Sequence, residues 1–439
     1  MIALTLVAAF FGLILIGAPI AVALGGSAVV TSMLFSPIAD GIIGQKLFSN
    51  LNHFTLMAIP SFFLAAGLME QGGLVQRLVG LARAMVGHLK AGLGMTTVLT
   101  CIFFAAISGS SPATVAAVGN ILYPSLLKEG YSQKYAVGAL ATSGAIGILI
   151  PPSIPLILYG FVTETSIPAL FMAGIFPGLL YGVLLLATAR ILAGKEGIQT
   201  RPRASLKDLN RAFRSALPAL SLPVFIVVGI YGFPEFTLFG WKNDGGAIFT
   251  PTEAAAVSAV LAMVIGFFVY RELTLRDVLR ITAETGPRVG MIFWITANAL
   301  LFGFFLTKVG IPAAMAQLVV DWNLSPIVFL LCVNILLVIV GFFLEGVPTI
   351  LIFAPLLVPA AESLGIDAVH FAIIMVVNIE LGLITPPVGI NLFVASSISG
   401  MPVLQVFRAT LPWTIATVIT LLIVTYFPPL SMTLPDLMR

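Results

Sequence analysis

Two short polar stretches interrupt apolar sequence and carry residue types that bind ions. The first, ISGSSPAT at 107 to 114, offers glycine, serine, proline and threonine, and LEGVPT at 344 to 349 resembles it. Helix breaks at glycine and proline expose carbonyl oxygens and N–H groups that lipid cannot satisfy. Carbonyl and hydroxyl oxygens suit a hard cation, whereas the N-terminus of a half-helix attracts an anion such as a carboxylate. Both stretches therefore predict an ion and substrate site.

Two further breaks, GILIPPS at 147 to 153 and GLITPPVGIN at 382 to 391, follow these stretches along the chain. We expect each break to lie beside one of the polar stretches. The candidate substrate ligands are Ser108, Ser110, Ser111, Pro152, Ser153, Thr349, Pro387 and Asn391. The candidate ligands of a coupling cation are Ser110, Thr114, Gly147, Gly346, Thr349, Thr385 and Gly389.

The choice of coupling ion depends on which half of the chain carries carboxylates. Glu345 and Glu380 lie at or near the second pair of breaks, where the first half has Ser110 and Ala145. A proton-driven carrier usually needs a buried titratable group. Because the first pair has no carboxylate, neutral oxygens that bind Na⁺ are the simpler prediction. No organic cofactor is expected.

The composition defines the class of protein. Of the 439 residues, 59% are hydrophobic and 9% charged, which excludes a soluble globular protein and predicts a polytopic membrane protein. The two cysteines, Cys101 and Cys332, have no metal-ligand spacing. The sequence contains no phosphate-binding loop, dinucleotide fingerprint or nucleophile and base pair, so nothing supports an enzyme or a nucleic-acid partner.

Eight apolar runs are long enough to cross a bilayer. They are 2 to 17, 19 to 35, 54 to 70, 168 to 194, 216 to 233, 250 to 270, 289 to 307 and 404 to 427. Four further segments are too long or too interrupted for one ordinary span. We interpret 93 to 129 and 326 to 362 as re-entrant hairpins, and 131 to 164 and 367 to 399 as broken helices that cross.

The distribution of basic residues supports this topology. The most basic loop, 194 to 214, is expected on the cytoplasmic side. With both hairpins returning to the side they enter from, only Lys46, Lys242, Lys308 and Arg439 of the 21 lysines and arginines fall outside. Two amphipathic stretches, 35 to 54 and 271 to 288, are expected to lie along the interface as arms.

The chain contains an internal repeat. A shift of 235 residues aligns 114 to 164 with 349 to 399 without a gap, with seven identities, five of them glycine or proline. The matched residues are Thr114 with Thr349, Leu122 with Leu357, Pro124 with Pro359, Gly130 with Gly365, Gly147 with Gly382, and Pro151 and Pro152 with Pro386 and Pro387. Five crossings separate the two hairpins, so the second copy is inverted. Inverted repeats with broken helices are typical of secondary transporters, whose sites lie near the midplane.

With these features in place, the chain resembles the large membrane subunit of TRAP transporters, the tripartite ATP-independent periplasmic carriers. The resemblance rests on 119 to 160, on IFTPTEAAAVSA at 248 to 259 and on LGLITPPVGINLFV at 381 to 394. In TPTEAAAV, Thr250 and Glu253 are the types of residue that cap a helix.

The resemblance implies an all-α, multi-pass protein of the bacterial inner membrane that works as an elevator coupled to two or more Na⁺ ions. It also implies three partners: a small four-helix membrane subunit on a separate chain, a periplasmic solute-binding protein, and a carboxylate substrate such as a C4-dicarboxylate or sialic acid. The transport domain would comprise 93 to 164 and 326 to 399. The scaffold would comprise 1 to 92, 165 to 325 and 400 to 439.

Other functions are kept as alternatives. A stand-alone dicarboxylate carrier of related architecture would need no binding protein. A channel would not accumulate its substrate above equilibrium, and a membrane-embedded transferase would need paired catalytic groups.

Overall fold

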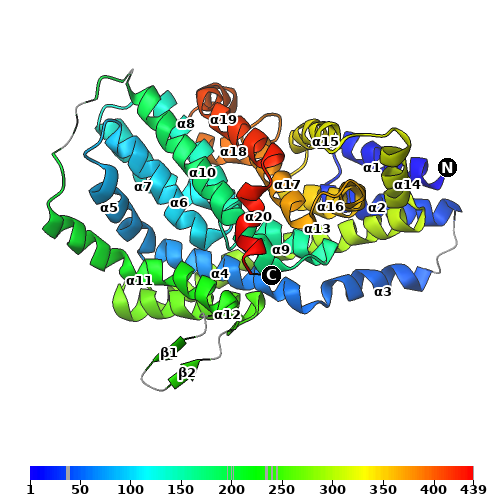
Figure 1. Ribbon diagram of the computed structural model, residues 1–439, viewed down its shortest axis with the longest axis horizontal. Coiled ribbons are helices and arrows are strands. Elements are labelled where there is room, and N and C mark those ends of the chain that lie inside the picture. Colours follow the sequence, from blue (N-terminus) through cyan, green and yellow to red (C-terminus); the bar gives the residue numbers. More distant parts are fainter. Residues whose placement is uncertain are drawn as a thin grey trace.

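The computed structural model describes residues 1 to 438 except 36 to 39, 195, 199, 201, 233 to 235, 239, 240, 244 and 245. Its described part is helical apart from one small hairpin of two strands, β1 (Phe236–Leu238) and β2 (Trp241–Asn243), which pair antiparallel with Thr237 opposite Lys242. Figure 1 shows this hairpin projecting from the helical body beyond α11 and α12. The predicted all-helical fold class is confirmed, and the hairpin is an addition to it.

The helices follow the predicted order. The first half contains α1 (Ile2–Leu15), α2 (Ile20–Phe35), α3 (Asp40–Leu51), η1 (Phe54–Met57), α4 (Ala58–Gln71), α5 (Leu74–Val86), α6 (Gly92–Ser108), α7 (Ser111–Lys128), α8 (Gln133–Ser143), η2 (Gly144–Ile148), α9 (Ile154–Thr163) and α10 (Ile167–Ala193). The second contains α11 (Leu206–Tyr231), α12 (Pro251–Val264), η3 (Ile265–Val269), α13 (Leu275–Lys308), α14 (Ile311–Asp321), α15 (Pro326–Gly341), α16 (Gly346–Ser363), α17 (Ala368–Leu383), α18 (Ile390–Ser399), α19 (Val403–Tyr426) and α20 (Pro429–Asp436).

Seven helices in the described part of the chain are long and apolar enough to cross a membrane. The division of the N-terminal region into α1 and α2 is as predicted, and α6–α7 and α15–α16 form the two hairpins. The capping prediction for TPTEAAAV is confirmed. The Thr250 N–H donates to Glu253 Oε2 at 2.8 Å, and the Glu253 N–H donates to Thr250 Oγ1 at 3.3 Å.

Two predicted boundaries were wrong. The arm 271 to 288 and the span 289 to 307 are one continuous helix, α13, because Pro287 removes a backbone hydrogen bond without ending the helix. The span predicted at 216 to 233 begins earlier, as α11 at Leu206, where Ser205 Oγ caps the Asp208 N–H at 3.1 Å. The other arm is α3, but part of that prediction, 36 to 39, lies outside the described residues.

Three short helices were missed: α5, α14 and α20. On α5, buried Leu74, Leu78 and Leu81 share one face, and Arg77 and Arg83 point to charged partners. The predicted elements leave 71 to 92 without a helix. The helical period of apolar residues in this segment was the signal that could have revealed the helix.

The repeat extends well beyond the aligned segment. The same shift of 235 residues places α7 (Ser111–Lys128) onto α16 (Gly346–Ser363) residue for residue. It also places α2 on α12, α5 on α14, α6 on α15, α8 on α17, α9 on α18 and α10 on α19, with ends that agree within a few residues. Five crossings separate the hairpins, namely α8 with α9, then α10, α11, α12 and α13. The two copies therefore have opposite orientations.

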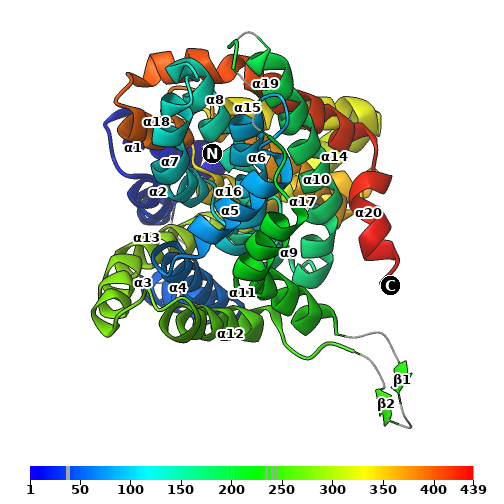
Figure 2. The same ribbon diagram turned by 90° about the vertical axis from the view of Figure 1, so that its left-hand side faces the viewer.

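The packing divides the helices into two groups. Each hairpin packs against the other copy's broken helix, α16 against α9 and α7 against α18. Helices α10 and α19 pack against α8, α17 and each other. In contrast, α4 packs against α12 and α13, and α2 packs against α13. Figure 2 shows α3, α4, α12 and α13 together on one side, with α7, α8, α18 and α19 on the opposite side.

Candidate ion and substrate site

The first hairpin tip gathers oxygen atoms. Helix α6 ends at Ser108, Gly109 turns the chain with φ of +59°, and α7 begins after Ser110. The hydroxyls of Ser108 and Thr114 lie 2.8 Å apart, and Thr114 Oγ1 donates to the Ser110 carbonyl at 2.9 Å. Ser108 and Thr114 are fully buried. Three oxygens from one short turn therefore meet in a site closed to solvent.

The first break packs directly onto this oxygen cluster. A Cβ at Gly147 would lie 2.7 Å from Thr114 Oγ1 and 2.8 Å from the Ser110 carbonyl oxygen, so only glycine fits. The structure thus brings together three predicted cation ligands, Ser110, Thr114 and Gly147. Hydroxyl and carbonyl oxygens in a buried pocket fit the chemistry of a hard cation such as Na⁺.

The second tip repeats part of this geometry. Thr349 Oγ1 donates to the Glu345 carbonyl at 2.8 Å, which is the repeat equivalent of the bond from Thr114 to Ser110. At the neighbouring break, a Cβ at Gly389 would lie 2.8 Å from the Thr385 carbonyl oxygen. The second tip has Phe343, Glu345 and Gly346 where the first has Ser108, Ser110 and Ser111, so the two tips are related but not equivalent.

Each tip is joined to its break by the backbone. The Ile154 N–H donates to the Gly109 carbonyl at 3.4 Å, and the Val388 N–H donates to the Phe342 carbonyl at 3.1 Å. These bonds satisfy groups that the breaks would otherwise leave exposed. Both breaks contain a cis proline peptide, Pro151–Pro152 and Pro386–Pro387.

The two tips line one cavity of about 80 Å³. Ser110 and Ser111 come from the first tip, and Glu345 and Gly346 come from the second. The remaining lining residues are Phe63, Gly109, Pro112, Ile148, Ile154, Pro155, Ile292, Val347, Ile379 and Leu383. The cavity therefore lies between the hairpins and the helices α4 and α13, which supply Phe63 and Ile292.

Three helix N-termini converge on this cavity. Helix α7 begins at Ser111, α9 at Ile154 and α16 at Gly346, and all three residues line it. Neither Ser110 nor Glu345, the N-cap residues of α7 and α16, uses its side chain to cap the helix. Amide groups at uncapped N-termini attract anions. This arrangement is suited to a carboxylate, although no lysine or arginine is among the lining residues.

Glu345 is the charged side chain in this lining. Its negative charge would repel an anion and so counteract the attraction of the N-terminal dipoles. A cation bound beside Glu345 would remove that repulsion. The electrostatics of the cavity thus favour binding an anion and a cation together.

The predicted substrate residues divide into two groups. Ser110 and Ser111 line the cavity between the tips, whereas Ser108, Pro152, Ser153, Thr349, Pro387 and Asn391 are not among its lining residues. Ser153 caps α9, and its Oγ donates to the Ile148 carbonyl. The Asn391 amide donates to Ser111 Oγ at 2.7 Å and to the Ala141 carbonyl at 3.2 Å, so it connects the second break to the first hairpin. Their roles in binding stay predictions.

The predicted cation ligands of the second half do not gather at the cavity. Of Thr385, Gly346, Thr349 and Gly389, only Gly346 lines the cavity. Thr385 lies just beyond α17, and its Oγ1 donates back to the Leu381 carbonyl at 2.7 Å. The second oxygen cluster is therefore less convergent than the first.

Sequence reasoning missed the apolar walls of the cavity. Phe63 and Ile292 lie in ordinary spans, where nothing in the sequence separates a residue that faces the cavity from one that faces lipid. Ile379 and Leu383, in α17, precede Pro386 by about two turns and one turn of helix. Their proximity to a Gly and Pro break was the only available signal.

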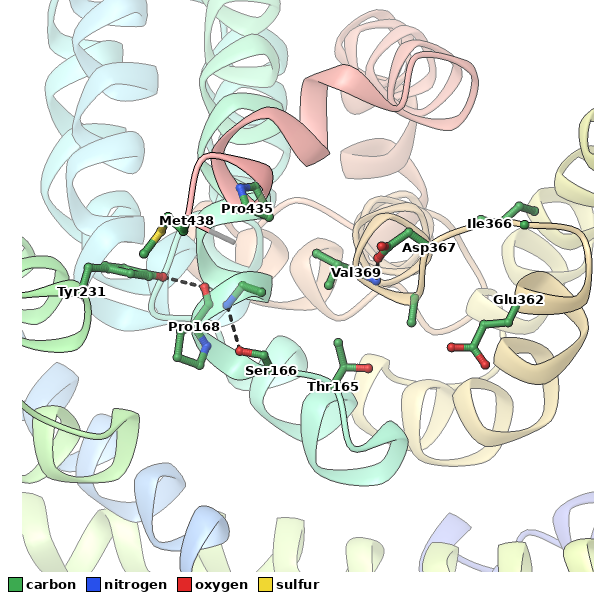
Figure 3. Close-up of a pocket in the computed structure, with 13 residues that line it drawn as sticks. Thr165, Ser166, Pro168, Tyr231, Glu362, Ile366, Asp367, Val369, Pro435 and Met438 are labelled. Atoms are coloured by element: carbon green, nitrogen blue, oxygen red, sulfur yellow. Dashed lines mark hydrogen bonds between the residues drawn. The ribbon is translucent and has the colours of Figure 1, made fainter. Parts of the chain in front are cut away.

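A larger cavity of about 670 Å³ lies elsewhere, at one end of the molecule. Figure 3 shows Tyr231 of α11, Ser166, Glu362, Asp367 and Met438 around it. The Tyr231 hydroxyl donates to the Pro168 carbonyl at 2.6 Å. This cavity contains none of the hairpin tips or breaks. We therefore place the candidate transport site in the smaller cavity, where the helix termini converge.

The inverted copies, hairpin tips and broken helices define a membrane transporter, and comparisons with known proteins agree. Residues 7–430 match the family model of the tripartite ATP-independent periplasmic transporter, DctM component. The chain is 46% identical to the C4-dicarboxylate TRAP transporter large permease protein DctM of Pseudomonas aeruginosa, over 94% of this chain and 93% of that protein. It is 33% identical to the sialic acid TRAP transporter large permease protein SiaM of Vibrio cholerae, over 98% and 97%.

The fold also matches a solved structure. Neisseria gonorrhoeae MtrF aligns with a TM-score of 0.64 at 13% identity, over 97% of this chain and 94% of that one. The chain belongs to the DctM family, the large permease component of TRAP transporters. Its relatives are transporter permeases, so the expected assignment as a transporter rather than an enzyme is confirmed.

Proposed function

We propose that the protein is the large permease of a Na⁺-coupled TRAP transporter that takes up a small organic acid across the bacterial inner membrane. Family membership over nearly the whole chain is the observation that carries this proposal. The named relatives transport C4-dicarboxylates or sialic acid. A carboxylate is thus the substrate class that we infer for this chain.

The site geometry supports both ligands. Uncapped N-termini of α7 and α16 provide amides for a carboxylate. The buried oxygens of Ser108, Ser110 and Thr114 provide ligands for Na⁺. When bound, Na⁺ would add positive charge next to the substrate anion, and the tips would hold the two in one cavity.

The packing supports an elevator mechanism. The cavity lies between the hairpins on one side and Phe63 and Ile292 on the other. A unit made of the hairpins and broken helices could move past this apolar wall with its ligands in place. Because α10 and α19 pack against the broken helices, we propose that they move with this unit, although the sequence analysis assigned them to the scaffold.

The partners follow from the family. We propose that a small membrane subunit completes the scaffold and that a periplasmic solute-binding protein delivers the substrate.

Reconstitution tests the proposed function. The chain with its small subunit is placed in proteoliposomes, and the binding protein is loaded with the acid that raises its melting temperature most. Uptake above equilibrium should require an inward Na⁺ gradient and the binding protein. Uptake driven by a pH gradient without Na⁺ would contradict Na⁺ coupling, and uptake without the binding protein would favour the stand-alone carrier.

A further inference from the structure

A second polar cluster lies in the core between the broken helices, away from the lining of the cavity between the tips. Glu380 of α17 is fully buried, and neither carboxylate oxygen has a hydrogen-bond partner among the described residues. A buried carboxylate is normally paired or bound to a metal ion, because leaving it alone in a low-dielectric interior is costly. The transport site described above does not use this group.

Oxygen atoms from three other helices meet around Tyr181, and two of these helices, α10 and α19, pack against α17. Tyr181 of α10, which lies within electrostatic range of Glu380, shares a hydrogen bond of 2.8 Å with Thr417 of α19. The Tyr181 hydroxyl also lies 3.2 Å from the carbonyl oxygen of Thr142, at the end of α8. Thr142 Oγ1 is itself buried without a partner. These groups offer oxygen ligands and no positive charge.

The internal repeat shows that the fold does not need this polarity. The residues at the equivalent positions are Ala145 for Glu380, Ala416 for Tyr181, Gly182 for Thr417 and Val377 for Thr142. All four are apolar or lack a side chain, and the same helices pack around them. The cluster takes two residues from each half, and the equivalent set of four positions is apolar throughout. Such a departure from the repeat indicates a function rather than a packing requirement.

We propose that Glu380 binds a Na⁺ ion inside the bundle, with the oxygens of Tyr181, Thr417 and Thr142 as additional ligands. A carboxylate and neutral oxygens drawn from four helices form a ligand set that a hard cation prefers. The ion would neutralise the buried charge and hold α8, α10, α17 and α19 together. This site is distinct from the Ser108 and Thr114 cluster, and the inference rests on the proposed Na⁺ coupling.

The test uses the complex with the small subunit, purified in lipid nanodiscs. Bound Na⁺ is counted with radioactive ²²Na⁺, and the melting temperature is followed as NaCl replaces choline chloride at constant ionic strength. Glu380→Gln keeps the shape and removes the charge, and Tyr181→Phe removes one hydroxyl. Glu362→Gln, at an exposed glutamate of α16, is the matched control.

We expect Glu380→Gln to bind one Na⁺ fewer than the wild type. Tyr181→Phe should need at least fivefold more Na⁺ for the same thermal stabilisation, and Glu362→Gln should behave as the wild type. If Glu380→Gln does not fold, the Tyr181→Phe titration decides. Unchanged stoichiometry and Na⁺ dependence in the folded variants would overturn the inference and leave Glu380 as a neutral core residue. A wild type that binds no Na⁺ would also overturn the proposed coupling.

Discussion

Replacing Thr114 by valine tests whether the first tip binds the coupling ion. The change preserves shape and removes one hydroxyl, which makes hydrogen bonds of 2.8 Å to Ser108 Oγ and 2.9 Å to the Ser110 carbonyl. A buried hydrogen bond contributes about 1 kcal/mol net. The two lost bonds therefore correspond to about 2 kcal/mol of stability at the tip.

The same oxygen is a proposed Na⁺ ligand, so the loss should also appear in ion binding. A contact to a charged group contributes about 2 kcal/mol, so losing this ligand should weaken Na⁺ binding by that amount. At about 1.4 kcal/mol for each factor of ten, this corresponds to a roughly 30-fold higher Na⁺ concentration for half-maximal uptake. Uptake in proteoliposomes is measured against NaCl at constant ionic strength. Expression and melting temperature are recorded in parallel.

Thr97→Val is the matched control. Thr97 lies in the same hairpin, is fully buried and donates to the Leu93 carbonyl at 3.0 Å. It should lower stability by about 1 kcal/mol, because one hydrogen bond is lost, without changing the Na⁺ dependence. The reasoning is refuted if both variants show the same half-maximal Na⁺ concentration as the wild type, because Thr114 would then be only structural.

Three further predictions concern residues around the site. Gly147→Ala should reduce uptake at least tenfold, because its Cβ would displace Thr114 Oγ1 and the Ser110 carbonyl; normal uptake would show that the break can shift. Asn391→Leu should lower the free energy of unfolding by about 2 kcal/mol, because Ser111 Oγ and the Ala141 carbonyl lose their donor, and an unchanged melting temperature would contradict this. Phe63→Trp should fill the cavity and abolish uptake while preserving Na⁺-dependent thermal stabilisation, whereas full uptake would place the substrate elsewhere.

The breaks and tips could be predicted because they depend on residue types with strong backbone preferences. Glycine at 109 marked the first tip, and prolines at 151, 152, 386 and 387 marked the two breaks. The 235-residue shift predicted the pairing of these features between the two halves. The convergence of Ser110, Thr114 and Gly147 followed from that pairing. In this region the residue types were sufficient to predict that the first tip contacts the first break.

The remaining features depend on packing, and a single apolar residue in the sequence does not reveal what it packs against. Nothing local indicates that Phe63 and Ile292 form the cavity wall or that α10 packs with the broken helices. The continuity of α13 through Pro287 was missed because a proline beside a charged stretch resembles a boundary. The hydrogen bond from Asn391 to Ser111 joins residues far apart in the sequence, and neither residue alone indicates it.

The unequal construction of α13 and its counterpart has a mechanical consequence. In the first half, the equivalent segment is divided into α3 and α4 by a short turn around His53, whereas α13 runs unbroken for 34 residues. At 1.5 Å per residue its length is about 51 Å, well beyond the roughly 30 Å of a hydrocarbon core. The pair α3 and α4 can bend at the turn between them, whereas α13 must tilt as one rigid helix. Membrane thickness should therefore act on the two sides of the carrier unequally, so that lipid acyl-chain length becomes a control on its working cycle.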